Sequence, residues 1–128
     1  MAKNEVRLLA VRIPPYRHPR NKWREKIYAA VKTGMDANGI NKNSYKKLRL
    51  EIRARLYFGE NELELHDVDN RLKDIMDALQ GRMGGPKKVR KFEPIIPNDK
   101  QIFMVSICKQ PPTAQSGLMG HLEIREHR

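Results

Sequence analysis

The sequence predicts an α+β domain in which two main helices cover a mixed β-sheet, with the element order β-α-β-α-β-β. Segments with the period of an amphipathic helix alternate along the chain with short segments that are rich in β-branched residues or alternate strictly. The chain has 128 residues, of which 39% are hydrophobic, and this suits one compact domain with one core. We therefore expect residues 1–128 to form a single domain.

The first half of the chain predicts a strand, a helix and a second strand. Residues Val6–Ile13 are short and β-branched, and they stop at a Pro-Pro pair, which is typical of a strand. A helix is expected to begin at Asn21, a suitable N-cap, and to end at Gly34. Residues Lys46–Phe58 alternate without interruption, which predicts a long, half-buried strand with a basic outer face.

The second half predicts a helix, a loop and two strands. The helix is expected to begin at Asp69 and to close at Gly81, with a core stripe made of Leu72, Ile75, Met76 and Leu79. Residues 82–97 are expected to form an irregular loop that is rich in basic residues. Residues Gln101–Gln110 and Gly120–His127 then predict the last two strands.

Charge indicates the class of partner. The chain has 26 Lys and Arg against 15 Asp and Glu, which gives a formal net charge of +11. Such a basic protein gains affinity for nucleic acid by releasing counterions from phosphates. The single cysteine, Cys108, rules out an internal disulfide and is expected to be buried. We expect no signal peptide and no membrane span, and hence a cytoplasmic protein.

The acidic residues are concentrated. Five of the 15 acids lie in the ten residues from position 60 to position 69. Carboxylates repel phosphate unless a cation lies between them, so this concentration in a basic chain favours a divalent metal. The alternative is a solvated loop, which we prefer for the three glutamates, Glu60, Glu62 and Glu64.

The two aspartates at the start of the second helix leave two readings open. Asp67 and Asp69 lie two apart in extended chain, so their side chains can converge. Asp69, Lys73 and Asp77 follow at i, i+4 and i+8, and we expect them along the edge of the core stripe. The pair of aspartates either caps the helix or binds Mg²⁺ through oxygen. Asp99 is a further carboxylate at a loop–strand junction, where spacing alone makes it a turn residue.

The stretch "DVDNRLKDIMDALQG", followed by "NDKQI", resembles the RusA family of Holliday junction resolvases. The family motif is Asp-x-Asp-Asn, a lysine three residues on, then Asp-Ala-Leu, with a later Asn/Asp-Asp-x-Gln at the start of a strand. Every element is present in this order, and the predicted order of strands and helices fits as well. The chain departs from the family in the long insertion at about 82–97, whose basic residues we expect to contact phosphates or to cover the junction.

The resemblance implies a homodimeric endonuclease that depends on Mg²⁺, or on Mn²⁺, and cuts four-way DNA junctions by paired symmetric nicks. It implies that Asp67, Asp69 and Asp99 bind the metal, and that Lys73 is catalytic with them. Asn70, Asp77 and Gln101 would have supporting roles, Asp77 as a partner of Lys73. The residues expected to bind DNA are Arg17, Arg20, Lys22, Arg82, Lys87, Lys88, Arg90 and Lys91.

Two other functions fit the same charge pattern. One is a non-catalytic nucleic-acid-binding protein, for which the aspartates would tolerate substitution and a chelator would have no effect. The other is a metal-dependent nuclease that acts on flaps or on other branched DNA, which a panel of substrates would distinguish.

Overall fold

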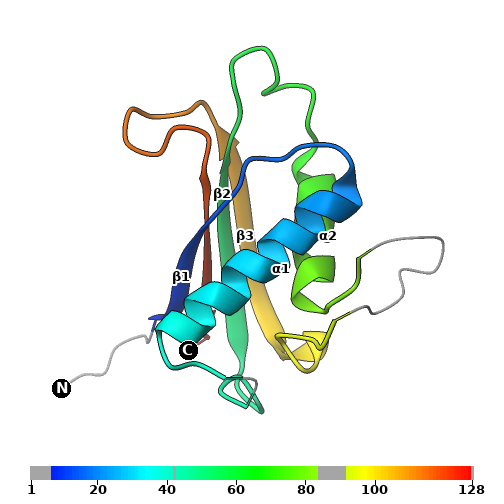
Figure 1. Cartoon of the computed structure of the whole chain (residues 1–128), viewed down its shortest axis with the longest axis vertical. Helices are drawn as coiled ribbons and strands as arrows, with labels where there is room; N and C mark the ends of the chain where they lie inside the picture. The colour runs from blue at the N-terminus through cyan, green and yellow to red at the C-terminus, as the bar shows by residue number, and fades with distance from the viewer. Residues whose placement is uncertain (1–6, 42, 84–91, 128) are drawn as a thin grey trace.

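The computed structural model describes residues 7–41, 43–83 and 92–127 (Figure 1). It is a small single-domain α+β fold with a mixed four-stranded sheet and two helices, which confirms the predicted class. A short 3₁₀ helix, η1, precedes the third strand. The elements are β1 (Arg7–Ile13), α1 (Arg20–Ala37), β2 (Leu50–Tyr57), α2 (Val68–Leu79), η1 (Asp99–Gln101), β3 (Ile102–Gln110) and β4 (Gly120–Glu126).

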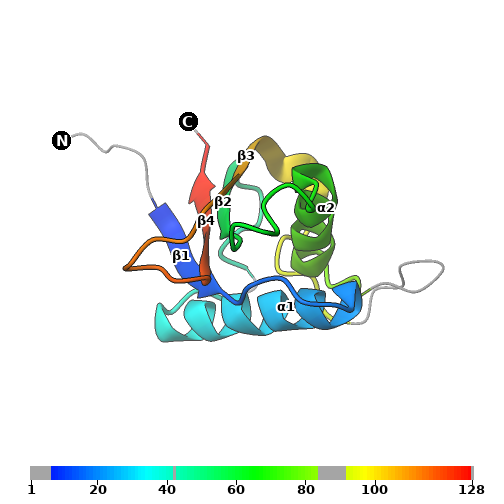
Figure 2. The ribbon, with the colours of Figure 1, turned by 90° about the horizontal axis from the view of Figure 1, so that it is seen from above.

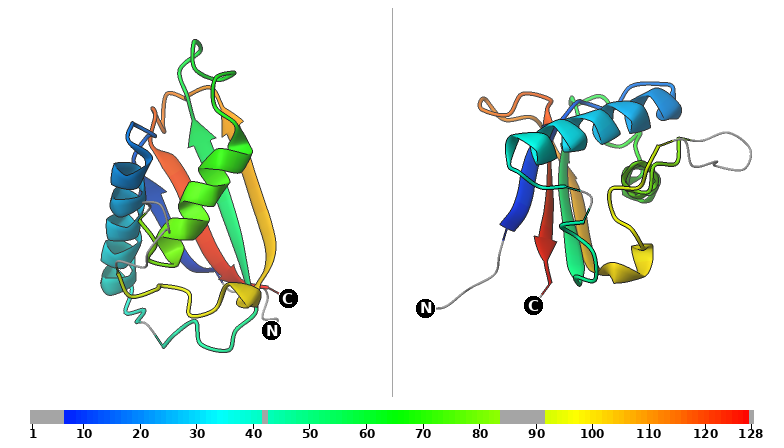
Figure 3. Two further views of the ribbon diagram at one scale, coloured as in Figure 1. Left: turned by 90° about the vertical axis from the view of Figure 1, so that its right-hand side faces the viewer. Right: turned by 60° about the horizontal axis from the view of Figure 1, so that its bottom comes forward.

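The sheet has the strand order β1-β4-β2-β3, so β3 lies at its edge. The β1–β4 and β4–β2 pairs are antiparallel, whereas β2 and β3 are parallel. A parallel pair needs a crossover connection, and α2 is that connection. Both helices cover the same face of the sheet, and the core lies between them and the strands (Figures 2 and 3).

Helix α1 differs from its prediction at both ends. It continues through Gly34 to Ala37, and its N-cap position is Pro19, which makes no side-chain capping bond. Gly34 does not end the helix because its role is close packing: a Cβ atom there would lie 2.3 Å from Cγ1 of Val11 on β1. The helix continues one turn further because Met35 is buried in the core.

Strand β2 confirms the predicted alternation on its inner face and corrects it on the outer face. Every second residue from Leu50 to Leu56 is buried against the helices. On the outer face Arg53 is exposed, but Glu51 is buried, since its carboxylate contacts His127 at 2.9 Å and accepts a hydrogen bond from Arg53. The hydrogen bond with His127 lowers the pKa of Glu51.

The core face of α2 is rotated from the predicted stripe. Ile75 and Leu79 are buried as expected, but Leu72 and Met76 are only half-buried. The rest of the buried face consists of Arg71, Asp74 and Ala78. At about 100° per residue, this is a turn of roughly 80° away from the apolar stripe. Cys108 on β3 is likewise half-buried, not buried as predicted.

The second half of the predicted basic insertion, about 82–97, is attached to the end of α2. Gly81, at a φ of 75°, accepts a hydrogen bond through its carbonyl from the backbone N–H of Phe92. A Cβ atom on Gly81 would lie 2.1 Å from the carbonyl oxygen of Phe92, so only glycine allows this approach. Beyond it, Ile95 and Ile96 are buried and bond to Leu79. The chain that leads to Asp99 is therefore anchored to the C-terminal end of α2.

Among the helices that the structure describes, none is long and apolar enough to cross a membrane. Lys87, Lys88, Arg90 and Lys91 lie outside the described residues.

Candidate functional site at the start of α2

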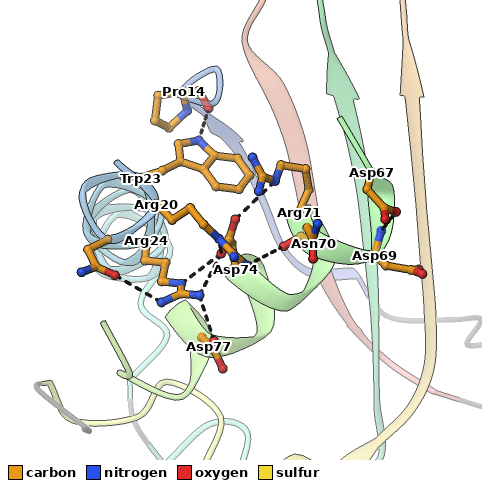
Figure 4. A network of polar contacts seen from close by, with 11 residues as sticks. Pro14, Arg20, Trp23, Arg24, Asp67, Asp69, Asn70, Arg71, Asp74 and Asp77 are labelled. Carbon is orange, nitrogen blue, oxygen red and sulfur yellow. Dashed lines mark hydrogen bonds and ion pairs between the residues drawn. The ribbon is translucent and has the colours of Figure 1, made fainter. Parts of the chain in front are cut away.

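The first turn of α2 carries two exposed carboxylates. Asp67 is the N-cap residue, and its Oδ1 accepts a hydrogen bond from the backbone N–H of Asp69 at 3.0 Å (Figure 4). Capping therefore explains one oxygen of Asp67. The carboxylate of Asp69 is not needed for that bond, because Asp69 takes part through its backbone. Both side chains are exposed to solvent, where oxygen ligands are accessible to a hydrated cation.

A buried ion-pair network fixes α2 against α1. The carboxylate of Asp74 is fully buried, and three arginines contact it: Arg20 at 2.9 Å, Arg24 at 2.9 Å and Arg71 at 3.3 Å (Figure 4). Arg24 also pairs with Asp77 at 3.3 Å. Because Arg20 and Arg24 belong to α1 and the others to α2, the network holds the two helices together.

The network extends to the turn between β1 and α1. The guanidinium of Arg71 lies 3.7 Å from the ring centre of Tyr16, a close cation–π contact. The indole N–H of Trp23 donates a hydrogen bond to the carbonyl of Pro14 at 2.8 Å. The turn is thus attached both to α1 and to the buried face of α2.

On the other side, β3 holds the loop that precedes α2. The ammonium group of Lys109 donates hydrogen bonds to the carbonyl oxygens of Leu63 and of His66, the latter at 2.7 Å. His66 directly precedes Asp67. The start of α2 is therefore fastened to the C-terminal end of β3.

Asp99 is exposed at the start of η1. Asn98 and Gln101 form a capping box around this short helix. The side-chain amide of Gln101 donates to the carbonyls of Tyr45 at 2.6 Å and of Leu48 at 2.8 Å. These contacts attach Asp99 to the loop before β2, at the end of the sheet where β2 and β3 begin.

Within one chain, Asp99 does not lie beside Asp67 and Asp69. Asp67 follows the end of β2, whereas Asp99 precedes the start of β3, and the two strands run parallel with Leu50 opposite Ile102. Helix α2, whose 12 residues extend about 18 Å, lies between Asp67 and Asp99 in the chain. Figure 1 shows the loop before α2 (green) at one end of the sheet and η1 (yellow) at the other. Across residues 7–41, 43–83 and 92–127, no three His, Cys, Asp or Glu side chains are grouped so that they could hold a metal ion.

The other predicted residues of α2 lie at different depths. Asp69 and Lys73 are exposed, not at the core boundary as predicted, because they lie opposite the buried face, which is centred on Arg71 and Ala78. Asn70 is exposed, and its carbonyl accepts a hydrogen bond from Arg20 at 3.4 Å. Asp77 is partly buried in its ion pair with Arg24.

Three of the basic residues predicted to bind DNA are freely exposed on the described surface: Arg17, Lys22 and Arg82. Arg17 and Lys22 line a hollow of about 180 Å³ beside the start of α1. Arg20 is partly exposed, but its guanidinium is bound to Asp74, so its first role is structural.

Sequence reasoning missed the residues that hold the site in place. Arg24, Arg71, Asp74 and Lys109 contact partners far away in the sequence or on the buried side of α2. The spacing of Arg71 and Asp74, three residues apart, is the local signal that an ion pair lies on one face of the helix.

Comparisons with known proteins identify no relative: no family model matches the chain, and no curated protein matches it.

Replacing Asp74 with alanine is expected to lower the free energy of unfolding by about 3–5 kcal/mol, because it leaves the buried Arg24 without a counter-charge. Urea unfolding followed by the fluorescence of Trp23, the single tryptophan, measures the change. The matched control is Asp36→Ala, an exposed aspartate on α1, which is expected to change stability by less than about 0.5 kcal/mol. Equal losses in the two variants would contradict a stabilising role for the network.

Proposed function

We propose that this protein is a Mg²⁺-dependent endonuclease of the RusA type that cuts four-way DNA junctions. One observation carries the proposal: two exposed carboxylates stand together on a helix start that is held from both sides, in a chain of net charge +11. Exposed acids oppose DNA binding by themselves, so their position on such a basic protein favours a divalent cation between protein and phosphate.

The donor set at the start of α2 fits Mg²⁺. Asp67 and Asp69 offer carboxylate oxygens from two residues, and Mg²⁺ uses few protein carboxylates and keeps several waters. Mn²⁺ accepts the same ligands. When bound there, the ion would lower the pKa of a coordinated water and neutralise charge on the phosphate.

The chain's own residues supply the rest of the reaction. Lys73 is exposed one helical turn beyond Asp69, on the same side of α2, where its ammonium would stabilise charge on the leaving oxygen. Arg17 and Lys22 would hold phosphates along the DNA at the end of the molecule that contains the start of α2. The buried ion-pair network would hold α2 in place when DNA binds.

We further propose that the active protein is a homodimer joined through β3. This edge strand exposes Phe103, Met104 and Val105 at 55%, 45% and 36%. A long apolar edge strand is normally covered by another element, and a second copy of β3 is the simplest cover. Symmetric cleavage of a four-way junction also calls for two sites related by a two-fold axis.

Such a dimer would complete the site with a residue of the partner. In an antiparallel β3–β3 pair centred on the middle of the strand, the start of the partner's β3 lies beside the end of the first chain's β3. That end is where Lys109 holds the loop before Asp67. Asp99 of the second copy would therefore approach Asp67 and Asp69 of the first, across the distance that separates them within one chain.

The activity test uses purified protein on a synthetic four-way junction with Mg²⁺. Wild type is expected to cut opposite strands, a chelator to abolish cutting, and Asp69→Asn to reduce the cleavage rate by about 100-fold or more with junction binding kept. Asp36→Asn makes the same change of charge away from the site and is expected to cut at the wild-type rate. If wild type binds junctions and leaves them intact, the non-catalytic alternative holds; equal cutting of flaps would favour the broader nuclease.

A complementation test asks whether Asp99 acts across the dimer. Copies with Asp67→Asn and with Asp99→Asn are co-expressed with different tags, and the mixed dimers are isolated over both tags. If Asp99 serves the partner's site, each mixed dimer has one site with both changes and one intact site, so it nicks one strand. The nicked product distinguishes this from full resolution.

The control for that test is a mixed dimer of Asp67→Asn with Asp69→Asn. Both residues lie on one helix start, so each site carries one change and no cleavage is expected. If the Asp67–Asp99 mixture is as inactive as this control, each chain supplies its own Asp99.

A further inference from the structure

A cavity of about 530 Å³ opens at the end of the molecule where α2 begins. It lies between the turn after β1, the end of β2 and the loop before α2. Half of its ten lining residues carry aromatic rings: Tyr16, His18, Tyr57, Phe58 and His66. We call this cavity the aromatic pocket. Its volume lies within the range of sites that hold small organic groups.

The rings of the aromatic pocket are held in fixed positions. Phe58 and His66 stack at 4.4 Å with 15° between their planes, and Tyr16 meets His66 edge-on at 5.2 Å. Behind Tyr16 lies the guanidinium of Arg71, itself bound to the buried Asp74. The rings therefore hold one another in position, as a preformed binding site requires.

The polar groups at the pocket indicate what kind of flat group it accepts. Arg17 is exposed at the rim and can bind a phosphate. Glu62 is also exposed there, 3.3 Å from His66, and its carboxylate can accept a hydrogen bond from an exocyclic amine. Aromatic walls, an amine acceptor and a phosphate-binding cation together match a nucleotide.

We propose that the aromatic pocket receives one unstacked nucleobase of the branched DNA. This base-binding proposal rests on the proposed function and extends it to how branched DNA would be positioned at the site. A base inside the pocket would lie against His66, the residue next to Asp67, and would hold the branch point at the end of the molecule where α2 begins. In continuous duplex every base is stacked, whereas a branch point offers bases that leave the stack at lower cost. The pocket would therefore favour branched DNA over duplex.

The hollow on the outer face of the sheet does not offer the same chemistry. It has a similar volume, about 550 Å³, and its lining includes Arg53, Arg55 and His121. A single imidazole among guanidinium groups and strand side chains provides charge for phosphate but no pair of rings for stacking. This comparison favours the aromatic pocket as the base-binding site.

Photocrosslinking tests the proposal directly on the wild-type protein. Four-way junctions carry 5-iodouracil at one branch-point position at a time and are bound in Ca²⁺ without Mg²⁺, so that the DNA stays intact. Irradiation is expected to crosslink one branch-point position to Tyr16, Phe58 or His66, and mass spectrometry of the peptides locates the crosslink. Crosslinks that map only to other residues, or a failure to bind the junction, overturn the proposal.

Substitutions provide the second measurement. His66→Ala is expected to weaken junction binding by about 10-fold and to leave duplex binding unchanged, whereas His66→Phe, which keeps a ring, is expected to bind the junction like wild type. The matched control is His121→Ala, the same substitution at an exposed imidazole on β4 outside the pocket, which is expected to bind junction and duplex like wild type. Equal losses on junction and duplex would overturn the proposal.

The two proposals fail in different ways. If the protein cuts junctions and no crosslink reaches the aromatic pocket, the base site is wrong and the nuclease stands. If the pocket crosslinks to the junction and Mg²⁺ produces no cutting, the nuclease is wrong and the base site stands.

Discussion

The structure depends on one buried carboxylate. Asp74 is removed from solvent, and a charge in that position is tolerated only when partners replace its water. Arg20 and Arg24 reach it from α1, and Arg71 reaches it from its own helix. The packing of α2 on α1 and the neutralisation of Asp74 are therefore coupled, because Arg20 and Arg24 contact Asp74 only when the two helices are packed together. Burial of apolar residues places both helices on the sheet. The ion cluster around Asp74 determines how α2 is rotated about its own axis.

That rotation decides what α2 presents to solvent. Since Arg71 and Asp74 face inward, the opposite side of the helix is left to Asp69 and Lys73. Because Arg71 also makes a cation–π contact with Tyr16, the rotation of α2 fixes the position of a ring in the wall of the aromatic pocket. From the other side, Lys109 holds the carbonyl of His66. The exposed acids, the exposed lysine and the pocket are thus parts of one rigid end of the molecule, which is what an arrangement for binding a metal and a nucleotide together requires.

Local patterns in the sequence were enough to predict the order of the elements and the inner face of β2, because hydrophobic periodicity reports which residues of an element face a core. They were not enough for α1 or α2. In the sequence, Gly34 looks like the residue that ends a helix. In the structure it allows α1 to pack closely against Val11, which lies more than 20 residues earlier in the chain. Asp74 looks like a surface charge because two of its arginines lie about 50 residues earlier in the chain. The separation of Asp99 from Asp67 could not be predicted from the sequence either. It follows from the parallel pairing of β2 and β3. The alternation of apolar and polar residues along a strand does not reveal the direction of the neighbouring strand.

The parallel crossover has one more consequence. It separates Asp99 from the start of α2, so Asp67 and Asp69 lie there without the third carboxylate that the sequence predicts, and β3 lies at the edge of the sheet. In the proposed dimer, one pairing would address both features, because two antiparallel copies of β3 would cover each other's apolar residues and would bring Asp99 of each copy to the site of the other. Under the proposed function, metal binding and dimer formation would then be linked equilibria, so that each stabilises the other by mass action. A single chain bound to DNA would lack the activity to nick it, and cutting would be confined to the symmetric assembly that meets both strands of a junction.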